Sequence, residues 1–419
     1  MDQRIRAIAE QCSQGKTGVN ELDLLHLRPY VEGFLDPHWL SERLNEYEAW
    51  ASANSDPFLQ RSLLHRPLGM NMLVASIWAA RSWENIYIED PSFWPPGGAK
   101  RLINIACSLA VLELHAGTML DSSALEHLRQ RLQASDQLWG IIHECGLFAH
   151  LINRGAEVEP RFLRKADPMD IIVRWRGQQV PVQCKSKRPG AGRVISQDVC
   201  TRLAGSVARD LKVAGRRMLV RIGSTGTIRD TDIDFLRDQI RRGAGSAMGP
   251  EMVPHQGRVF TVKTLPLSGS FTAEQARSYL RSFDFHLGMV IGEPRAGTVG
   301  YEANLMVGID ARPNETRRVW RSLRDSIVFA ARQLEGGPPG IVAVHYADPI
   351  PEFEALRPGD AHMLQEIARI VHTLPHVAAV MLSCEPDLQL PGARGAGTVR
   401  AYVDGSRLPA DFPMGRPVR

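Results

Sequence analysis

The sequence lacks the cysteine and histidine patterns of redox and zinc proteins. None of its six cysteines stands in a CxxC pair, and no group of cysteines and histidines has the spacing of zinc ligands. Most of the cysteines lie in apolar stretches, which is typical of free buried thiols in a reducing cytoplasm. We therefore exclude a disulfide-stabilised secreted domain and a zinc finger.

Long hydrophobic runs, leader-like segments and repeats are also missing. The first residues, MDQRIRAIAEQ, contain no apolar stretch of the kind found in a secretory signal. No uninterrupted apolar run approaches the ~18 residues of a membrane-spanning helix. There is no internal repeat, heptad pattern or low-complexity tract. These absences predict a cytoplasmic protein that has no membrane contact.

Two common catalytic motifs are absent as well. The sequence contains no Gly-x-Ser-x-Gly motif, which in many hydrolases presents a nucleophilic serine. The glycine-containing stretch GSTGTIRD (residues 223–230) lacks the lysine of a P-loop. A serine hydrolase of that kind and a P-loop nucleotidase are therefore not predicted.

The composition that remains is that of an ordinary globular protein. Of the 419 residues, 44% are hydrophobic and 23% charged, and a net charge of +4 does not by itself indicate a nucleic-acid-binding protein. The apolar periodicity and the Gly/Pro-rich stretches predict an α/β protein. It divides into a mostly helical N-terminal region (1–130), a core (131–240), a linker or long loop (241–257) and a C-terminal α/β region (258–419).

Within the predicted core the elements follow the order helix, strand, strand, strand, helix, strand. Apolar residues at helical spacing predict a helix over 138–152, which contains Glu144. The stretches DIIVRW and VPVQCKSK flank the polar RGQQ, which is typical of a hairpin with a four-residue loop. A helix over 196–213 and a strand over 217–222 complete the core.

The hairpin gathers polar side chains on one face. Its apolar residues meet when Trp175 lies opposite Val180. That register places Asp170 opposite Lys185, with Gln183 diagonal to Asp170 at roughly 7–8 Å. Either these three groups form a site, or the hairpin faces solvent and carries a cross-strand ion pair.

This arrangement resembles the PD-(D/E)xK, restriction-endonuclease-like nucleases, whose core has an αβββαβ order. The matching residues are Glu144 in IIHECGLFAHLINRG, Asp170 in DPMDIIVRW, and Gln183 with Lys185 in VPVQCKSK. Two features depart from the family pattern. Asp170 follows the proline by two positions instead of one, and Gln183 replaces the second acid, a QxK form similar to that of the Mrr-like branch.

The resemblance implies a metal-dependent endonuclease that uses Mg²⁺ or Mn²⁺ to cleave a phosphodiester. Asp170 would be the main ligand, with the side-chain oxygen of Gln183 and the backbone carbonyl of Cys184 as auxiliary ligands. Lys185 would orient the attacking water or stabilise the developing charge, and Glu144 would contact a metal-bound water. Three other acids compete for the role of Glu144: Glu157, Glu159 and Asp167.

A basic stretch follows the candidate lysine. Residues 185–221 contain ten basic and two acidic residues, so this stretch carries +8 in a chain of net charge +4. Such a stretch is typical of a surface that binds the nucleic-acid backbone. The residues expected to contact nucleic acid are Lys187, Arg188, Arg193, Arg202 and Arg209.

Two functions from different classes are therefore predicted. The first is a metal-dependent nuclease acting on DNA, for which the family resemblance implies a role in restriction or antiviral defence, as a homodimer or with a defence-complex partner. The second is a catalytically inactive nuclease-fold protein that binds nucleic acid or serves as an assembly subunit. The uncharged Gln183 favours the second function, whereas the presence of both Asp170 and Lys185 favours the enzyme.

Overall fold

The computed structural model divides the chain into two compact units. Unit 1 consists of Met1–Ala49, Gly69–Pro189 and Trp320–Arg419, and unit 2 consists of Trp50–Leu68 and Gly190–Val319. The residues that the structure describes are 1–15, 19–53, 71–89, 97–165, 167–187, 194–195, 197–213, 217–243, 251–267, 275, 285–294, 301–310, 315–346, 361–384, 398–403, 407–409 and 411–412.

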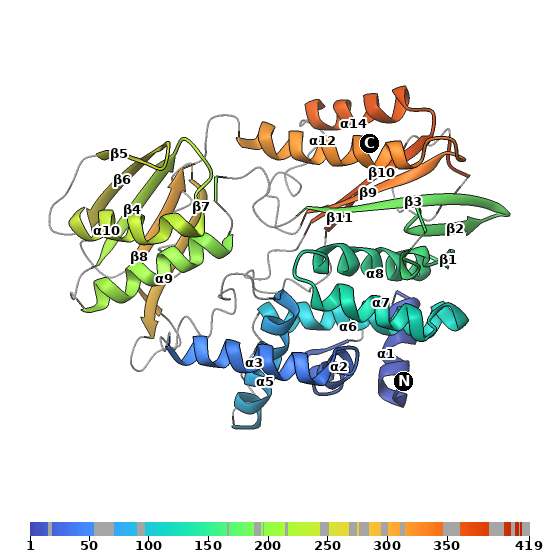
Figure 1. Cartoon of the computed structure of the whole chain (residues 1–419), viewed down its shortest axis with the longest axis horizontal. Coiled ribbons are helices and arrows are strands. Elements are labelled where there is room, and N and C mark those ends of the chain that lie inside the picture. Colours follow the sequence, from blue (N-terminus) through green and yellow to red (C-terminus); the bar gives the residue numbers. More distant parts are fainter. Residues whose placement is uncertain are drawn as a thin grey trace. The chain divides into compact units, whose positions relative to one another are not determined.

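Unit 1 begins with a group of helices (Figure 1). Their bounds are α1 (Gln3–Ser13), α2 (Leu24–Glu32), α3 (Pro37–Ala53), α5 (Met72–Glu89), α6 (Gly97–Ala116), α7 (Ser122–Gln133) and α8 (Leu138–Asn153). Within the described residues, only Ala99–Met119 has the length and hydropathy of a membrane-spanning helix. Its residues Leu102, Ala106 and Leu109 are buried, and α6 packs against α1, α2, α5 and α8. We therefore assign α6 to the core of this helical group.

In the described part of unit 1, six strands form a mixed sheet in the order β1-β2-β3-β9-β10-β11. Their bounds are β1 (Glu157–Glu159), β2 (Ile171–Trp175), β3 (Gln178–Lys187), β9 (Gly340–Tyr346), β10 (Val377–Cys384) and β11 (Thr398–Val403). β9 runs parallel to both of its neighbours, β3 and β10, and is buried along its whole length. Such a strand needs cover on both faces. α8 covers one face, and α12 (Glu315–Gln333) and α14 (Ala361–Thr373) cover the other (Figure 1).

Unit 2 has a sheet of its own, with the described strands in the order β5-β6-β4-β8-β7. The bounds are α9 (Gln197–Val213), β4 (Met218–Ser224), α10 (Ile233–Gly243), β5 (Glu251–His255), β6 (Arg258–Pro266), β7 (Phe285–Pro294) and β8 (Tyr301–Asp310). Leu203 of α9, Leu236 of α10 and Leu305 of β8 belong to one buried apolar cluster. The amphipathic helices therefore give unit 2 a separate core.

The structure divides the chain differently from the prediction made on the sequence. The segment 131–240 does not form one core, because α8 and β1–β3 lie in unit 1 whereas α9 and β4 lie in unit 2. β4 pairs with β6 and β8 and not with β3. The segment 241–257, predicted as a linker or long loop, contains the end of α10 and the strand β5. Likewise the segment 258–419 contributes strands to both sheets.

Unit 1 continues its sheet after the chain returns from unit 2. Along the chain α8, β1, β2 and β3 precede the segment Gly190–Val319 of unit 2, and most of α12 and then β9 follow it. β9 pairs in parallel with β3, with Val182 opposite Ile341. The order helix, strand, strand, strand, helix, strand is thus present in unit 1, but most of unit 2 is inserted before its second helix.

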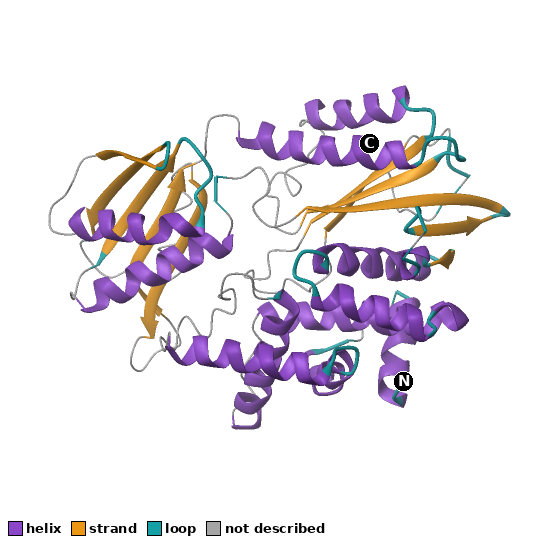
Figure 2. Cartoon of the chain, viewed as in Figure 1, coloured by secondary structure: helices purple, strands orange, loops and turns teal. Residues whose placement is uncertain are grey.

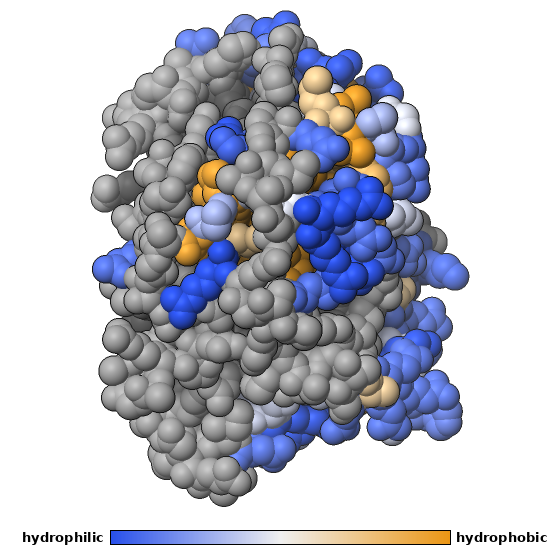
Figure 3. Space-filling view, turned by 90° about the vertical axis from the view of Figure 1, so that its left-hand side faces the viewer, coloured by the Kyte–Doolittle hydropathy of each residue, from blue (hydrophilic) through white to orange (hydrophobic). Residues whose placement is uncertain are grey.

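Helices and strands are mixed in both units (Figure 2), and the predicted α/β class is confirmed. Figure 3 shows one face of the chain, on which hydrophilic side chains make up most of the described surface. A smaller group of hydrophobic residues lies in the upper and middle part of that face. Burial of the apolar residues in two cores accounts for this distribution.

Candidate functional site

The hairpin of β2 and β3 positions the candidate site. Trp175 pairs with Gln178, and the turn between them consists of Arg176 and Gly177 with φ of 50° and 79°. Positive φ at both positions is the signature of a two-residue type I′ turn. The predicted register is therefore wrong by two residues, because Gln178 and its neighbour extend β3 instead of belonging to a four-residue loop.

The observed register keeps the predicted faces of the hairpin but changes the partner of Asp170. When this register is extended by one residue beyond the pair Ile171 and Val182, Asp170 lies opposite Gln183. Lys185 is then the diagonal neighbour of Asp170, at roughly 7–8 Å. Oδ2 of Asp170 accepts hydrogen bonds from Nε2 of Gln183 at 2.5 Å and from the backbone N–H of Cys184 at 2.7 Å. The acid and the amide therefore meet directly at the start of β2.

Gln183 retains an amide oxygen that is not hydrogen-bonded. The residue is 2% exposed, and its Oε1 has no hydrogen-bond partner among the described residues. A buried polar atom in this state costs about 1–3 kcal/mol, so a cation or an N–H donor arriving at Oε1 is favoured. The N–H and C=O of one residue in a strand point to the same side. The carbonyl of Cys184 is therefore directed toward the side on which Asp170 lies.

Glu144 has a partner other than the one predicted. Its two carboxylate oxygens accept hydrogen bonds from Nη1 and Nη2 of Arg131 at 2.6 and 2.9 Å. Arg131 comes from α7, which packs against α8. Burial raises the pKa of Glu144 to about 7, and the pair with Arg131 opposes this rise. Contact with a metal-bound water would require the bidentate pair to open.

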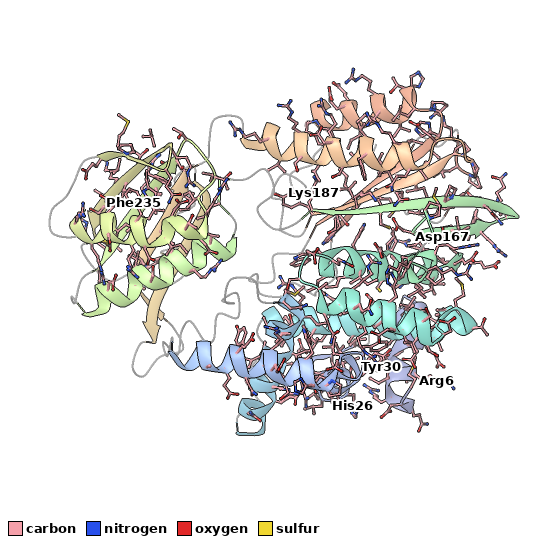
Figure 4. The ribbon with its side chains drawn as sticks, in the orientation of Figure 1. Arg6, His26, Tyr30, Asp167, Lys187 and Phe235 are labelled. Atoms are coloured by element: carbon pink, nitrogen blue, oxygen red, sulfur yellow. The ribbon has the colours of Figure 1, made fainter. Side chains whose placement is uncertain are left out.

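The three rival acids lie in ion pairs of their own. Glu159 and Asp167 pair with Arg161 at 2.8 and 3.2 Å, and Glu157 pairs with Arg174 at 3.6 Å. Asp167, labelled in Figure 4, also accepts a hydrogen bond from the backbone N–H of the residue two positions later. These contacts fix the segments around β1 and β2 and leave the rival acids outside the candidate site.

Lys185 lies on the same face of β3 as Gln183 and reaches toward α12. Its Nζ is 5.6 Å from the centroid of the Phe329 ring, a distance at which the ring face attracts a cation. Burial raises the pKa of Asp170, whereas the Cys184 N–H, the ammonium of Lys185 and the guanidinium of Arg131 oppose the rise. The pKa of Asp170 remains above its ordinary value, because burial outweighs the donors and positive groups around the carboxyl group.

The residues predicted to bind nucleic acid are divided between the two units. Lys187 ends β3 in unit 1 (Figure 4), whereas Arg202 lies on α9 in unit 2. Arg202 forms an ion pair with Asp230 at 2.7 Å, with the two side chains 17% and 11% exposed. This contact gives Arg202 a structural role in unit 2. Outside the described residues lie Arg188, Arg193 and the side chain of Arg209.

A single divalent cation fits part of this cluster. No three His, Cys, Asp or Glu side chains in the described chain come together as metal ligands. One carboxylate oxygen of Asp170, Oε1 of Gln183 and the Cys184 carbonyl are nevertheless the hard oxygens that Mg²⁺ accepts, with water as its other ligands. Because the Gln183 N–H now donates to Asp170, its amide has to turn before Oε1 faces a shared cation. Glu144 stays outside this oxygen set.

Three residues near the site were missed on the sequence. Arg131 and Phe329 belong to no motif, although Phe329 is an aromatic residue with a polar residue, Asp325 or Arg332, one turn away on either side of it. The third is His143, whose ring stacks on that of His345 at a centroid distance of 5.1 Å. Nδ1 of His345 lies 3.0 Å from Oγ of Ser383. The two rings link α8 to the central strand β9, and His143 directly precedes Glu144 in the sequence.

Comparison with known proteins gives no match: no family model matches the chain, and neither a curated protein nor a solved structure matches it. The functional assignment therefore depends on the contacts around Asp170.

Proposed function

We propose that the protein is a metal-dependent nuclease that cleaves DNA at the Asp170 cluster. The observation that carries the proposal is the convergence of Asp170, the Gln183 amide and the Cys184 backbone, with Lys185 on the same strand face. The element order of unit 1 supports the resemblance to restriction-endonuclease-like proteins, since β3 is followed in the sheet by a parallel strand. A role in restriction or defence belongs to the same proposal.

The residues divide the chemistry between them. When bound, a divalent cation supplies charge that offsets the phosphate and lowers the pKa of an attacking water. Asp170 and Oε1 of Gln183, with the Cys184 carbonyl, would hold it. Lys185 places an ammonium where negative charge develops on the phosphate. Arg131 holds the carboxylate of Glu144 and keeps it from competing with Asp170.

A second function is favoured by the internal balance of charges. Asp170 and Glu144 are two carboxyl groups that face two cations, Arg131 and Lys185, so the cluster carries no excess of negative charge that would require a metal ion. Both carboxylates already have hydrogen-bond donors. The alternative is therefore a protein that binds nucleic acid through the same fold and does not cleave it.

Cleavage of linear and supercoiled plasmid DNA with Mg²⁺, Mn²⁺ or EDTA tests the proposal. We expect cleavage by the parent only with metal, and a loss of at least about 100-fold in Asp170→Asn and Lys185→Ala, the size found for one group that stabilises transition-state charge. Lys185→Ala should still bind DNA, because one lysine contributes little to the total backbone attraction. Asp167→Asn is the matched control and should cleave like the parent.

Two outcomes would contradict the enzyme. If the parent protein binds DNA but does not cleave it with either metal, only the binding function remains. Equal cleavage rates for parent and Lys185→Ala would remove this lysine from the reaction.

A further inference from the structure

α12 presents one face to its unit and the opposite face to solvent. Leu323, Ile327 and Leu334 are buried. Of the exposed residues on the opposite face, Arg321, Asp325, Phe329 and Arg332 belong to unit 1, and we call these four the α12 stripe. At about 100° per residue these four fall within an arc of roughly 80°. They therefore form one continuous exposed surface.

Phe329 is the unusual member of the α12 stripe. The residue is 58% exposed, and it is the only aromatic residue among the large exposed hydrophobic residues of the described chain. Single exposed apolar side chains are common and need no function. The position of Phe329 sets it apart, because its ring lies against Nζ of Lys185 at the candidate site.

Two arginines of the stripe flank this ring. Asp325 pairs with Arg324 at 3.6 Å, whereas Arg321 and Arg332 have no ion-pair partner among the described residues. At 1.5 Å per residue, Arg321 lies about 12 Å before Phe329 along the helix and Arg332 about 4.5 Å after it. The stripe thus spans about 16 Å, the length of four to five stacked nucleotides at about 3.4 Å each.

We propose that the α12 stripe binds single-stranded or locally unpaired nucleic acid. Phe329 stacks on one base, because an aromatic ring stacks on the face of any base, and Arg321 and Arg332 contact phosphates on either side. In a duplex the base faces are covered by their neighbours, so a ring on an exposed helix reaches only an unpaired base. Lys185 then faces the phosphate beside the stacked nucleotide. The inference rests on the proposed function only in taking nucleic acid as the ligand.

Fluorescence anisotropy with the full chain in EDTA tests this inference, using a labelled 12-nucleotide oligodeoxythymidylate and a labelled 12-base-pair duplex. We expect the parent to prefer the single strand. Phe329→Ala should weaken single-strand binding by about 5- to 150-fold, the range for one base–aromatic stack. Phe329→Trp should retain the affinity, and Phe329→Leu should behave like Phe329→Ala. Thermal melting checks that these exposed substitutions leave the fold intact.

The arginines have a separate readout. Replacing Arg321 and Arg332 together by glutamine should flatten the slope of log affinity against log salt by about 1.4 for the single strand, since each phosphate contact contributes about 0.7. Met252→Ala is the control, because Met252 is 75% exposed on β5 of unit 2 and should not affect binding.

Three results would overturn the inference: no preference for the single strand, equal affinity of Phe329→Ala and the parent, or equal affinity of Phe329→Leu and Phe329→Trp. Because binding in EDTA needs no turnover, this test separates the two proposals. If the protein does not cleave DNA but the Phe329 variants change single-strand binding as expected, only the nuclease proposal is rejected. If it cleaves DNA but the Phe329 variants bind like the parent, only the proposal for the α12 stripe is rejected.

Discussion

At the scale of single residues, the pairing of buried polar atoms decides what the cluster can do. Asp170 receives two N–H donors and Glu144 receives two guanidinium donors, whereas Oε1 of Gln183 receives none among the described residues. Both acids therefore have hydrogen-bond donors, whereas one buried amide oxygen has none among the described residues. Gln183 is therefore the residue at which a bound cation should be most readily detected.

Gln183→Glu should make the cluster depend on metal. In EDTA the new carboxylate lies against Asp170, and the variant lacks the amide N–H that donates to Asp170 in the parent. We therefore expect a loss of about 3 kcal/mol in the free energy of unfolding. Mg²⁺ or Mn²⁺ should restore the melting temperature of this variant and raise that of the parent less. Gln183→Met, which offers neither charge nor oxygen, should melt independently of metal. Metal-independent melting of all three proteins would argue against a cation at Gln183.

His143 should make stability depend on pH. Burial and the neighbouring His345 lower the pKa of His143 to about 3, below its ordinary value of 6.5. Between pH 3 and pH 6.5 the unfolded chain therefore binds a proton at His143 that the folded chain does not bind. Stability consequently falls as the pH falls from 6.5 toward 3. The raised pKa of Glu144 acts in the opposite direction, because the folded state keeps its proton up to about pH 7.

Denaturant unfolding of the parent and of His143→Asn at pH 6.5 and pH 5.0 measures this contribution. Lowering the pH should cost the parent about 1.5 kcal/mol more than the variant, since one proton contributes about 1.4 kcal/mol per pH unit. Val342→Ala, another substitution on a buried residue of unit 1, should follow the pH dependence of the parent. The same pH dependence in the parent and in His143→Asn would mean that His143 is already protonated in the fold.

At the scale of elements, the sequence located strands and helices well but did not determine their register. The helix predicted over 138–152 is α8, and the alternation of apolar residues assigned the faces of the hairpin correctly. The loop length was the weak point, because Arg176 adopts a left-handed conformation that side chains other than Gly, Asn and Asp rarely take. Nothing in RGQQ distinguishes two turn residues from four. The observed register differs from the predicted one by two residues, so Gln183 instead of Lys185 lies opposite Asp170.

Gly177→Ala should destabilise the hairpin through its backbone. Gly177 has φ of 79°, and a Cβ there would meet no atom within 4 Å. The expected loss of about 1–2 kcal/mol therefore comes from the left-handed conformation alone. Gly337→Ala, where φ is not in that region and the nearest atom is 3.5 Å away, should change the free energy of unfolding far less. Equal losses in the two variants would exclude a type I′ turn.

At the scale of the whole molecule, the inserted unit is the feature that sequence reasoning did not find. RMLVRIG and GIVAVHY are both apolar stretches that predict strands. Strands that follow one another in the chain usually pair, so the first stretch was the natural partner for the hairpin. The structure assigns RMLVRIG to the sheet of unit 2 and pairs GIVAVHY with β3. Neither stretch carries a local signal that specifies its sheet.

The two cores should respond separately to substitutions. Leu305 and Leu109 are both buried, the first in unit 2 and the second in unit 1. Each change to alanine should cost about 2–5 kcal/mol through lost contacts and a cavity. In scanning calorimetry, Leu305→Ala should lower one unfolding transition and Leu109→Ala the other. A single transition that both variants lower equally would mean that the units unfold together.

The pairing of β3 with β9 also has a consequence during synthesis on the ribosome. About 160 residues separate Val182 from Ile341, which at about 5–20 residues per second is roughly 8–30 seconds of translation. Throughout that interval one edge of β3, including the backbone beside Gln183 and Lys185, has no strand to pair with and can attract other chains. The nascent chain therefore emerges with its candidate site half built, and unit 2 can fold before the sheet that carries the site is complete.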